Sequence, residues 1–264
     1  MNLHDKRVLG STGLKAGRLG IASSFGAPAA AYEEAFARGC NYFTWGSFLR
    51  GRSTAMREAI RNITRQGQRQ ELILAMIIYA HYAPLTRILL ERGLRVLGTE
   101  YADVLILDYF PKRPSQKVID GALELKEKGL VHHVGLTSHI RKLFPSLARE
   151  GIFDLFHLRY NIAHRSAETE IFPKLTQEER PGVVSFTATA WGKLLKQKKM
   201  PPGERAFQAA DCYRFVLANE AVDVCMMGAR NREQMQENLA LLDKGPLSVE
   251  ELERFRRIGD YVHG

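Results

Sequence analysis

Short apolar runs alternate with longer amphipathic segments along almost the whole chain. Runs rich in Val, Ile, Leu and Phe are typical of buried strands. Eight such runs predict strands at residues 19–23, 41–45, 72–78, 103–107, 131–136, 153–158, 183–187 and 222–227. The segments between them carry apolar residues three and four positions apart, which predicts helices at 53–65, 84–97, 115–128, 140–150, 204–218 and 231–242.

Glycines stand where the helices of this repeat should end. A helix commonly ends beside a residue in the left-handed conformation, which glycine adopts without a steric penalty. The glycines in this position are Gly39, Gly67, Gly98, Gly129 and Gly151. Their spacing supports the alternation of strands and helices.

The length of the repeat favours a closed barrel. Eight strand and helix pairs in 264 residues leave about 30 residues for each pair, which is the size of one βα unit. We therefore predict an α/β fold, a (β/α)8 TIM barrel that forms one domain over residues 1–264. The alternative, an open doubly wound sheet, needs a glycine-rich turn after its first strand, and residues 22–30 (ASSFGAPAA) match that turn poorly.

Two elements are expected outside the repeat. Residues 8–20 (VLGSTGLKAGRLG) have the pattern of a small β-hairpin with Gly10 and Gly13 at its turn. Such a hairpin can close the floor of the barrel. An extra helix is expected at the C-terminal end of the chain.

The composition is that of an ordinary globular protein, with 45% apolar and 25% charged residues. Cys40, Cys212 and Cys225 lie far apart and form no CxxC pair, so neither a disulfide framework nor a zinc site is indicated. No apolar run reaches the roughly 18 residues that a membrane helix needs, and the N-terminus has no apolar region of signal-peptide length. We therefore expect a cytoplasmic protein without a membrane partner and, because its histidines are scattered, without a catalytic metal.

The net charge of +9 raises the question of an anionic partner. The densest basic run, Lys193–Lys199, contains no aromatic residue and matches no nucleic-acid-binding motif. A solvated loop is the better interpretation of that run, so no nucleic-acid partner is expected. A positive field favours a small-molecule substrate that is itself anionic.

Residues 222–238 (VDVCMMGARNREQMQEN) combine a buried strand, a short turn and the start of a helix. Backbone N–H groups and the helix dipole favour a phosphate at such a helix start, and the Arg230 guanidinium can pair with it. The N-terminal part of the chain lacks common catalytic side chains. Residues 16–111 contain no lysine, residues 6–102 no aspartate and residues 5–80 no histidine.

Five segments, in order along the chain, resemble the aldo-keto reductase family. They are residues 7–14 (RVLGSTGL), 39–43 (GCNYF), 94–103 (LRVLGTEYAD), 129–135 (GLVHHVG) and 228–230 (GAR), the last followed by Gln234, Glu237 and Asn238. The resemblance implies a (β/α)8 barrel that holds NADP(H) across the C-terminal ends of its strands. It also implies a tetrad in which Tyr protonates a carbonyl oxygen, Lys paired with Asp lowers the Tyr pKa, and His orients the carbonyl.

All four tetrad positions depart from the family's pattern. The family's FDTAxxY falls on FTWGSFL, where Thr44 replaces Asp and Leu49 replaces Tyr. Ile77 stands in place of Lys, and Asp108 stands in place of His. The nearest tyrosine, Tyr42, precedes the donor position and is expected to point elsewhere. The usual proton relay is therefore predicted to be absent.

The resemblance assigns the adenosine-phosphate end of NADP(H) to the C-terminal segment. It implies that Arg230 pairs with the 2'-phosphate, that Asn231 and Gln234 support this phosphate, and that Glu237 and Asn238 hold the adenine amino group. The alternative is that Arg230 caps a loop and Glu237 lies on a helix surface without a ligand.

The implied nicotinamide end keeps only part of the family's pattern. Ser138 matches the serine that binds the carboxamide, whereas His139 replaces the usual Asn and His157 replaces the usual Gln. Phe186 replaces the tyrosine that stacks on the nicotinamide, and a phenyl ring offers a similar face. Lys193 is either a ligand of the pyrophosphate or a free surface lysine.

If the protein reduces carbonyls, another acid has to stand at the barrel mouth. Tyr79 with His81 or Asp108 is the candidate group, and the alternative for each is a rim residue that only makes hydrogen bonds. We consider three functions: an NADP(H)-dependent oxidoreductase with a rearranged proton donor, a non-catalytic NADP(H)-binding sensor or regulatory protein, and a lyase or isomerase. In the third, Asp108 or His157 would act as the base.

Overall fold

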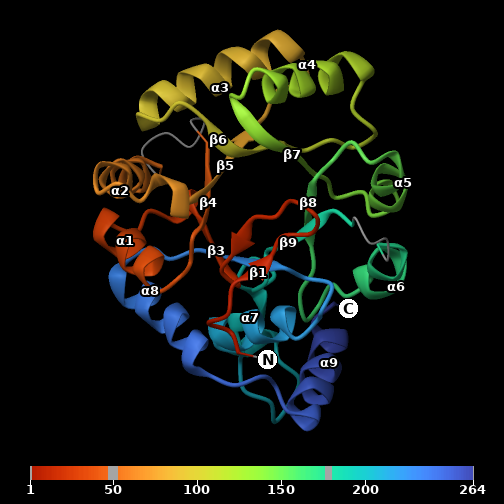
Figure 1. Cartoon of the computed structure of the whole chain (residues 1–264). Coiled ribbons are helices and arrows are strands. Elements are labelled where there is room, and N and C mark those ends of the chain that lie inside the picture. The colour runs from red at the N-terminus through yellow and green to blue at the C-terminus, as the bar shows by residue number, and fades with distance from the viewer. Residues whose placement is uncertain (1, 47–52, 176–179, 264) are drawn as a thin grey trace.

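The computed structural model describes residues 2–46, 53–175 and 180–263, and it forms the predicted (β/α)8 barrel (Figure 1). Eight parallel strands close in the order β10, β3, β4, β5, β6, β7, β8, β9. Their bounds are β3 (Leu19–Ala22), β4 (Tyr42–Trp45), β5 (Ile73–Ile78), β6 (Ala102–Leu107), β7 (Val131–Thr137), β8 (Leu155–Arg159), β9 (Gly182–Phe186) and β10 (Val224–Met227). All eight predicted strands are confirmed, each within two residues of its expected ends.

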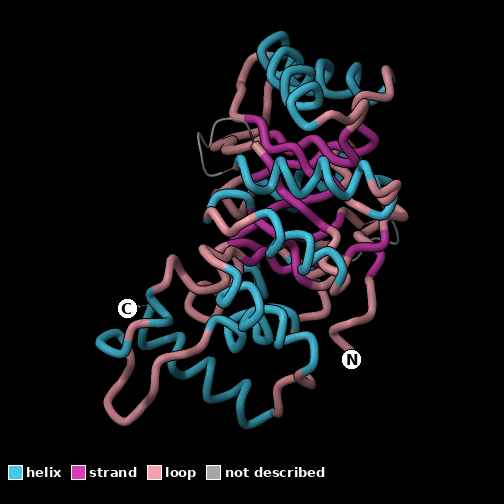
Figure 2. Tube along the Cα trace, turned by 90° about the vertical axis from the view of Figure 1, so that its left-hand side faces the viewer, coloured by secondary structure: helices cyan, strands magenta, loops and turns pink. Residues whose placement is uncertain are grey.

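Helices surround the strands, as Figures 1 and 2 show from two directions. They are α1 (Ala29–Ala37), α2 (Thr54–Arg65), α3 (Ala83–Leu97), α4 (Gln116–Glu127), α5 (Leu143–Glu150), α6 (Ala167–Glu170), α7 (Ala209–Leu217), α8 (Arg232–Leu239) and α9 (Val249–His263). Short 3-10 helices are η1 (Ser23–Phe25), η2 (Arg69–Glu71), η3 (Phe172–Lys174), η4 (Lys193–Leu195), η5 (Gln197–Lys199) and η6 (Ala240–Asp243). All five glycines predicted to end helices have a positive φ, between 65° and 89°.

The predicted helix at 204–218 is wrong over its first five residues, because α7 begins at Ala209. Gln208 and Asp211 form a capping box that starts the helix there. The preceding segment is held by other bonds. The Gln197 side chain donates to the Glu204 carbonyl and accepts from the Ala206 N–H.

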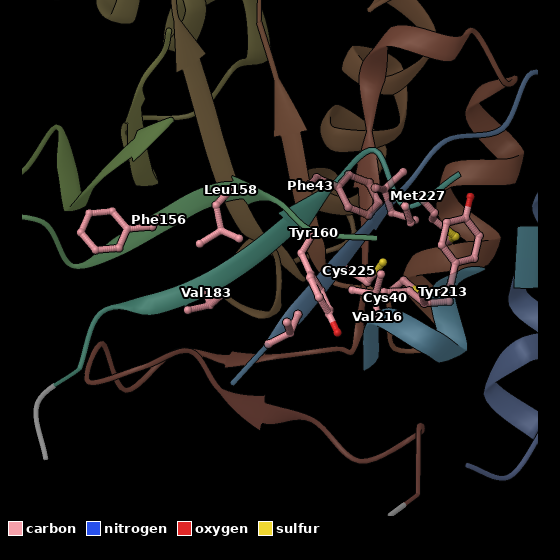
Figure 3. Close-up of a cluster of buried hydrophobic side chains, with 14 of the residues drawn as sticks. Cys40, Phe43, Phe156, Leu158, Tyr160, Val183, Tyr213, Val216, Cys225 and Met227 are labelled. Carbon is pink, nitrogen blue, oxygen red and sulfur yellow. The ribbon is translucent and has the colours of Figure 1, made fainter. Parts of the chain in front are cut away.

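Successive residues of each strand point alternately into the barrel and toward the helices. Tyr42 and Leu155 belong to the cluster that fills the barrel interior. Their neighbours Phe43 and Phe156 belong to the cluster between the strands and the helices. Figure 3 shows these outward side chains together with Tyr213 of α7. The same alternation decides which side chains at the strand ends face the barrel mouth.

The N-terminal hairpin closes the barrel floor as predicted. Strands β1 (Arg7–Val8) and β2 (Lys15–Ala16) pair antiparallel and cross the centre of the barrel in Figure 1. Leu9 is fully buried within the interior cluster. Gly10 lies so close to β9 that a Cβ atom there would be 2.2 Å from the Gly182 nitrogen. Only a residue without a side chain fits at this contact.

A buried carboxylate links the floor to the last two strands. Asp223 is fully buried and accepts hydrogen bonds from the Arg180 guanidinium at 2.6 and 2.9 Å and from the Val183 N–H at 2.8 Å. Arg7 of the hairpin lies 3.3 Å from the same carboxylate. Since a buried charge is tolerated only when it is paired and hydrogen-bonded, this cluster joins the hairpin to β9 and β10.

The expected extra C-terminal helix is α9. Its Phe255 ring packs edge-to-face on Phe207 at 4.7 Å, and Gly259 lies against the Ile162 carbonyl. Arg254 of α9 forms an ion pair of 2.6 Å with Glu204, which ties the segment before α7 to this helix. Within the described residues, no helix is long and apolar enough to cross a bilayer.

Candidate active site

The carboxyl ends of the strands open into a cavity of about 1190 Å³. Pockets for small ligands commonly measure roughly 300–1,000 Å³, so this cavity has room for a larger molecule such as a dinucleotide. Its walls come from the ends of β3 to β10, from η1 and from the first turns of α7 and α8. Ligand sites of (β/α)8 barrels lie at this end of the strands.

One end of the cavity is formed by the turn after β10 and by α8. Arg230, Gln234, Glu237 and Asn238 line it, so four of the five residues predicted at the adenosine-phosphate end lie together. The Arg230 side chain is exposed and makes no ion pair among the described residues. Asn231 does not line the cavity. Its side chain accepts the Gln234 N–H at 2.9 Å and so caps α8.

The turn after β10 also needs a glycine, because Phe25 of η1 packs directly against it. A Cβ atom on Gly228 would lie 2.1 Å from the Phe25 ring. Phe25 and Tyr213 both line the cavity, and neither was identified from the sequence. Phe25 falls in residues 22–30, where the sequence pattern concerns only a glycine-rich turn, and Tyr213 lies on a helix far along the chain.

Three of the four residues predicted at the nicotinamide end line another part of the cavity. His139 lies edge-on to Phe186, with ring centroids 5.6 Å apart, and His157 lies below them on β8. Ser138 is buried and does not line the cavity, because its hydroxyl donates to the Phe110 carbonyl at 2.6 Å. Lys193 is exposed on η4 and does not line the cavity either.

Tyr79 and Asp108 meet at the cavity wall and share a side-chain hydrogen bond. Asp108 is buried, and this burial raises its pKa although Tyr79, the Tyr109 N–H and Thr137 all donate to the carboxylate. Burial and the neighbouring carboxylate raise the pKa of Tyr79 as well. The predicted partner His81 does not line the cavity, since its ring packs on Phe110 at 4.2 Å.

Three of the four positions that depart from the family's tetrad lie at this mouth. Thr44 of β4 and Ile77 of β5 line the cavity together with Asp108, which follows β6. The Thr44 hydroxyl donates to the Ile21 carbonyl at 3.3 Å, which orients its methyl and hydroxyl groups within the wall. Leu49 lies outside the described residues.

Tyr42 points into the barrel, directly beneath the cavity. Its hydroxyl is hydrogen-bonded to His157 Nε2 at 2.7 Å, and both side chains are buried. Burial lowers the pKa of His157 to about 3 and raises that of Tyr42, so both groups are neutral. A buried imidazole with so low a pKa is a poor base.

The two tryptophans differ in their distance from the cavity. Trp191 lines the cavity and is exposed, whereas Trp45 is buried and lies against Gly93 of α3, on the outer side of β4. Trp191 is therefore the intrinsic fluorophore that can report a ligand. No cluster of three or more potential metal ligands occurs in the part of the chain that the structure describes.

The fold and the cavity define a (β/α)8-barrel protein with a ligand site of dinucleotide size at the carboxyl ends of its strands. The chain belongs to the aldo/keto reductase family, whose family model matches residues 9–211. The match ends before the turn that carries Arg230.

Solved structures with the same fold agree with this assignment. An aldo-keto reductase from Bacillus halodurans in its holo form has a TM-score of 0.79 and 20% identity, covering 96% of both chains. An aldo/keto reductase from Klebsiella pneumoniae, in complex with NADP and acetate, also has a TM-score of 0.79 and 20% identity. That match covers 97% of this chain and 96% of the Klebsiella chain. A comparison with curated protein sequences gave no match.

Proposed function

We propose that the protein is an NADP(H)-dependent oxidoreductase that reduces a carbonyl group, with the Tyr79 and Asp108 pair as its proton donor. The observation that carries this proposal is the cavity itself. Within one space of about 1190 Å³ it joins the turn of Arg230, which has no ion pair with any described residue, to an end lined by aromatic and acidic side chains. This arrangement matches a ligand that is anionic at one end and aromatic at the other.

The residues at both ends fit NADP(H). Arg230 and Lys244 line the cavity and supply positive charge for a phosphate, while Glu237 and Asn238 offer acceptors and a donor for an adenine. Phe186 offers an aromatic face at the other end. The NADP bound to the Klebsiella structure supports the same cofactor here. Bound NADPH would supply the hydride that reduces the carbonyl carbon.

The Tyr79 hydroxyl would then give a proton to the carbonyl oxygen, and the Asp108 carboxyl would replace it. This relay works only when Asp108 is protonated, because an ionised Asp108 holds the Tyr79 proton and keeps the Tyr79 pKa high. The raised pKa of Asp108 favours the protonated form relative to an ordinary aspartate. The reduction rate is therefore expected to be highest below the Asp108 pKa and to fall about tenfold per pH unit above it.

One observation favours a second candidate, a non-catalytic NADP(H)-binding regulator. The pKa of Tyr79 is raised by its burial and by the neighbouring Asp108 carboxylate. A tyrosine in this state is a weak acid at neutral pH. Binding of NADPH without turnover of any carbonyl compound would support this regulator in place of the oxidoreductase.

Cofactor binding is tested by titrating the protein with NADPH while Trp191 fluorescence is recorded. We expect a saturable change at micromolar NADPH. In Trp191→Phe the change should disappear, while calorimetry still detects binding. Absence of binding by both methods would refute both candidates.

Catalysis is tested by the loss of NADPH absorbance with a panel of aldehydes and ketones across a pH series. Tyr79→Phe and Asp108→Asn should each lower kcat roughly 10²- to 10⁴-fold, the usual contribution of general acid catalysis. Asp108→Asn should also remove the fall in rate with rising pH. Tyr82→Phe and Asp120→Asn, both exposed and outside the cavity, are the matched controls. Equal activity in Asp108→Asn and the wild type would exclude this donor.

A further inference from the structure

Arg159 does not itself line the cavity but lies beside two of its aromatic lining residues, and it has no carboxylate partner among the described residues. Leu155, His157 and Arg159 occupy alternate positions of β8, and the first two face the barrel interior and the cavity. Arg159 therefore extends from the rim on the same face. In the sheet register it pairs with Phe186, and its guanidinium lies 5.7 Å from the Trp191 ring. Phe186 and Trp191 both line the cavity.

The guanidinium has no anion to neutralise it among the described residues. Neither a hydrogen bond nor an ion pair joins Arg159 to any of them. The charged group that acts on it is Arg141, which repels it and is itself paired with Glu170 at 2.8 Å. The Arg159 side chain is partly buried, so its charge is less screened than that of a fully exposed arginine.

The positive charge of Arg159 acts on two neighbouring histidines. Burial and then Arg159 lower the pKa of His139 and of His164, the latter to about 4. The Asp108 charge acts on His139 in the opposite direction.

We propose that Arg159 binds a carboxylate of the substrate, so that the preferred substrates are carbonyl compounds that carry a carboxylate. This inference rests on the proposed reductase function. A guanidinium matches the two oxygens of a carboxylate with two parallel hydrogen bonds. The carboxylate takes no part in the reaction: the carbonyl gains a hydride at carbon and a proton at oxygen, NADPH becomes NADP⁺, and the product is a hydroxy acid.

A cofactor phosphate is the competing ligand for Arg159. The cations expected to meet phosphates, Arg230 and Lys244, lie on the turn after β10 and beyond α8. Arg159 instead pairs in register with Phe186, whose ring lies 5.6 Å from that of His139, and His139 in turn lies 5.7 Å from Tyr109, the residue after Asp108. This position favours the substrate over the phosphate.

The first experiment measures binding without turnover. Succinate and its uncharged analogue succinamide are titrated while Trp191 fluorescence and calorimetry are followed, with NADPH titrated separately. Succinate should bind the wild type, and Arg159→Met should weaken it roughly 10- to 100-fold, the range for losing a hydrogen-bonded charged partner. Arg159→Lys should recover part of this loss. Arg92→Met, an exposed residue of α3 with the same change in charge, should leave succinate binding as in the wild type.

Each result supports or overturns the proposal. Equal succinate affinity in Arg159→Met and the wild type overturns it. Weaker NADPH binding in Arg159→Met with unchanged succinate binding also overturns it, because Arg159 would then serve the cofactor. If the protein reduces no carbonyl but Arg159→Met still weakens succinate, the reductase function fails while the carboxylate site stands.

The second experiment compares turnover of 4-oxobutanoate and butanal, which have the same chain length. The wild type should have a kcat/KM roughly 10- to 100-fold higher for 4-oxobutanoate than for butanal. In Arg159→Met most of this difference should disappear, chiefly because the KM for 4-oxobutanoate rises. Wild-type enzyme that reduces butanal as efficiently as 4-oxobutanoate would contradict the substrate class while leaving the reductase function in place.

Discussion

The buried pair of Tyr42 and His157 makes the stability of the barrel depend on pH in a defined direction. The pKa of His157 is about 3 in the folded protein and about 6.5 when the chain is unfolded. Its neutral form therefore stabilises the fold fully above pH 6.5. Below that pH the unfolded chain binds a proton that the folded chain does not, so stability is lost as the pH falls toward 3.

Linkage with these two pKa values gives a loss of about 2 kcal/mol between pH 7 and pH 5 from His157 alone. Other groups titrate in the same range, among them His139 and His164, so the prediction concerns a difference between two proteins. In His157→Gln the amide oxygen can still accept the Tyr42 hydroxyl, but position 157 no longer titrates.

The assay is urea unfolding of the wild type and His157→Gln at several pH values from 7 to 5. The difference in unfolding free energy between the two proteins should change by about 2 kcal/mol across this range, in favour of His157→Gln at low pH. His132→Gln, at an exposed position of β7, should follow the wild type. A change below about 0.5 kcal/mol in the difference would mean that His157 is protonated or solvated in the folded barrel, and the reasoning would be refuted.

Three further predictions concern other parts of the molecule. Tyr42→Phe should lower the unfolding free energy at pH 7 by about 1–3 kcal/mol, because it leaves the buried His157 Nε2 without its hydrogen-bond partner, and urea unfolding would show this directly. Asp223→Asn should cost about 3–5 kcal/mol, because it leaves the Arg180 and Arg7 charges without a buried partner; a Tm within one degree of the wild type would contradict it. Arg230→Met should weaken NADPH roughly 10-fold or more and NADH little, and equal losses for both cofactors in calorimetry would exclude a 2'-phosphate contact.

The positions of candidate site residues could be predicted from the sequence where a single strand end or a single turn places them. The ends of β5 and β6 placed Tyr79 and Asp108 on neighbouring strands, and the turn after β10 placed Arg230 at a helix start. Two residues that match the family's cofactor-binding pattern in the sequence do not line the cavity, because their side chains form hydrogen bonds with nearby groups of the protein. Ser138 bonds the Phe110 carbonyl, and Asn231 caps α8.

Two site residues could have been found from the same periodicity. Arg159 follows His157 by two positions and therefore shares its face of β8. Phe25 follows the first strand directly, where βα loops of a barrel line the ligand site. That Arg159 lacks a carboxylate is not visible in the sequence, because it depends on which acids the other loops bring to the rim.

Local patterning alone was sufficient for the order of strands and helices, since a period of two or of 3.6 residues follows directly from strand and helix geometry. Closure of the eight strands, the hairpin beneath them and the helix-ending glycines followed from the same short-range rules. Only the tertiary structure brought Tyr42 to His157, 115 positions away, and left Arg159 without a carboxylate partner among the described residues. These contacts cross the barrel, and a contact between distant segments is decided by packing of the whole chain.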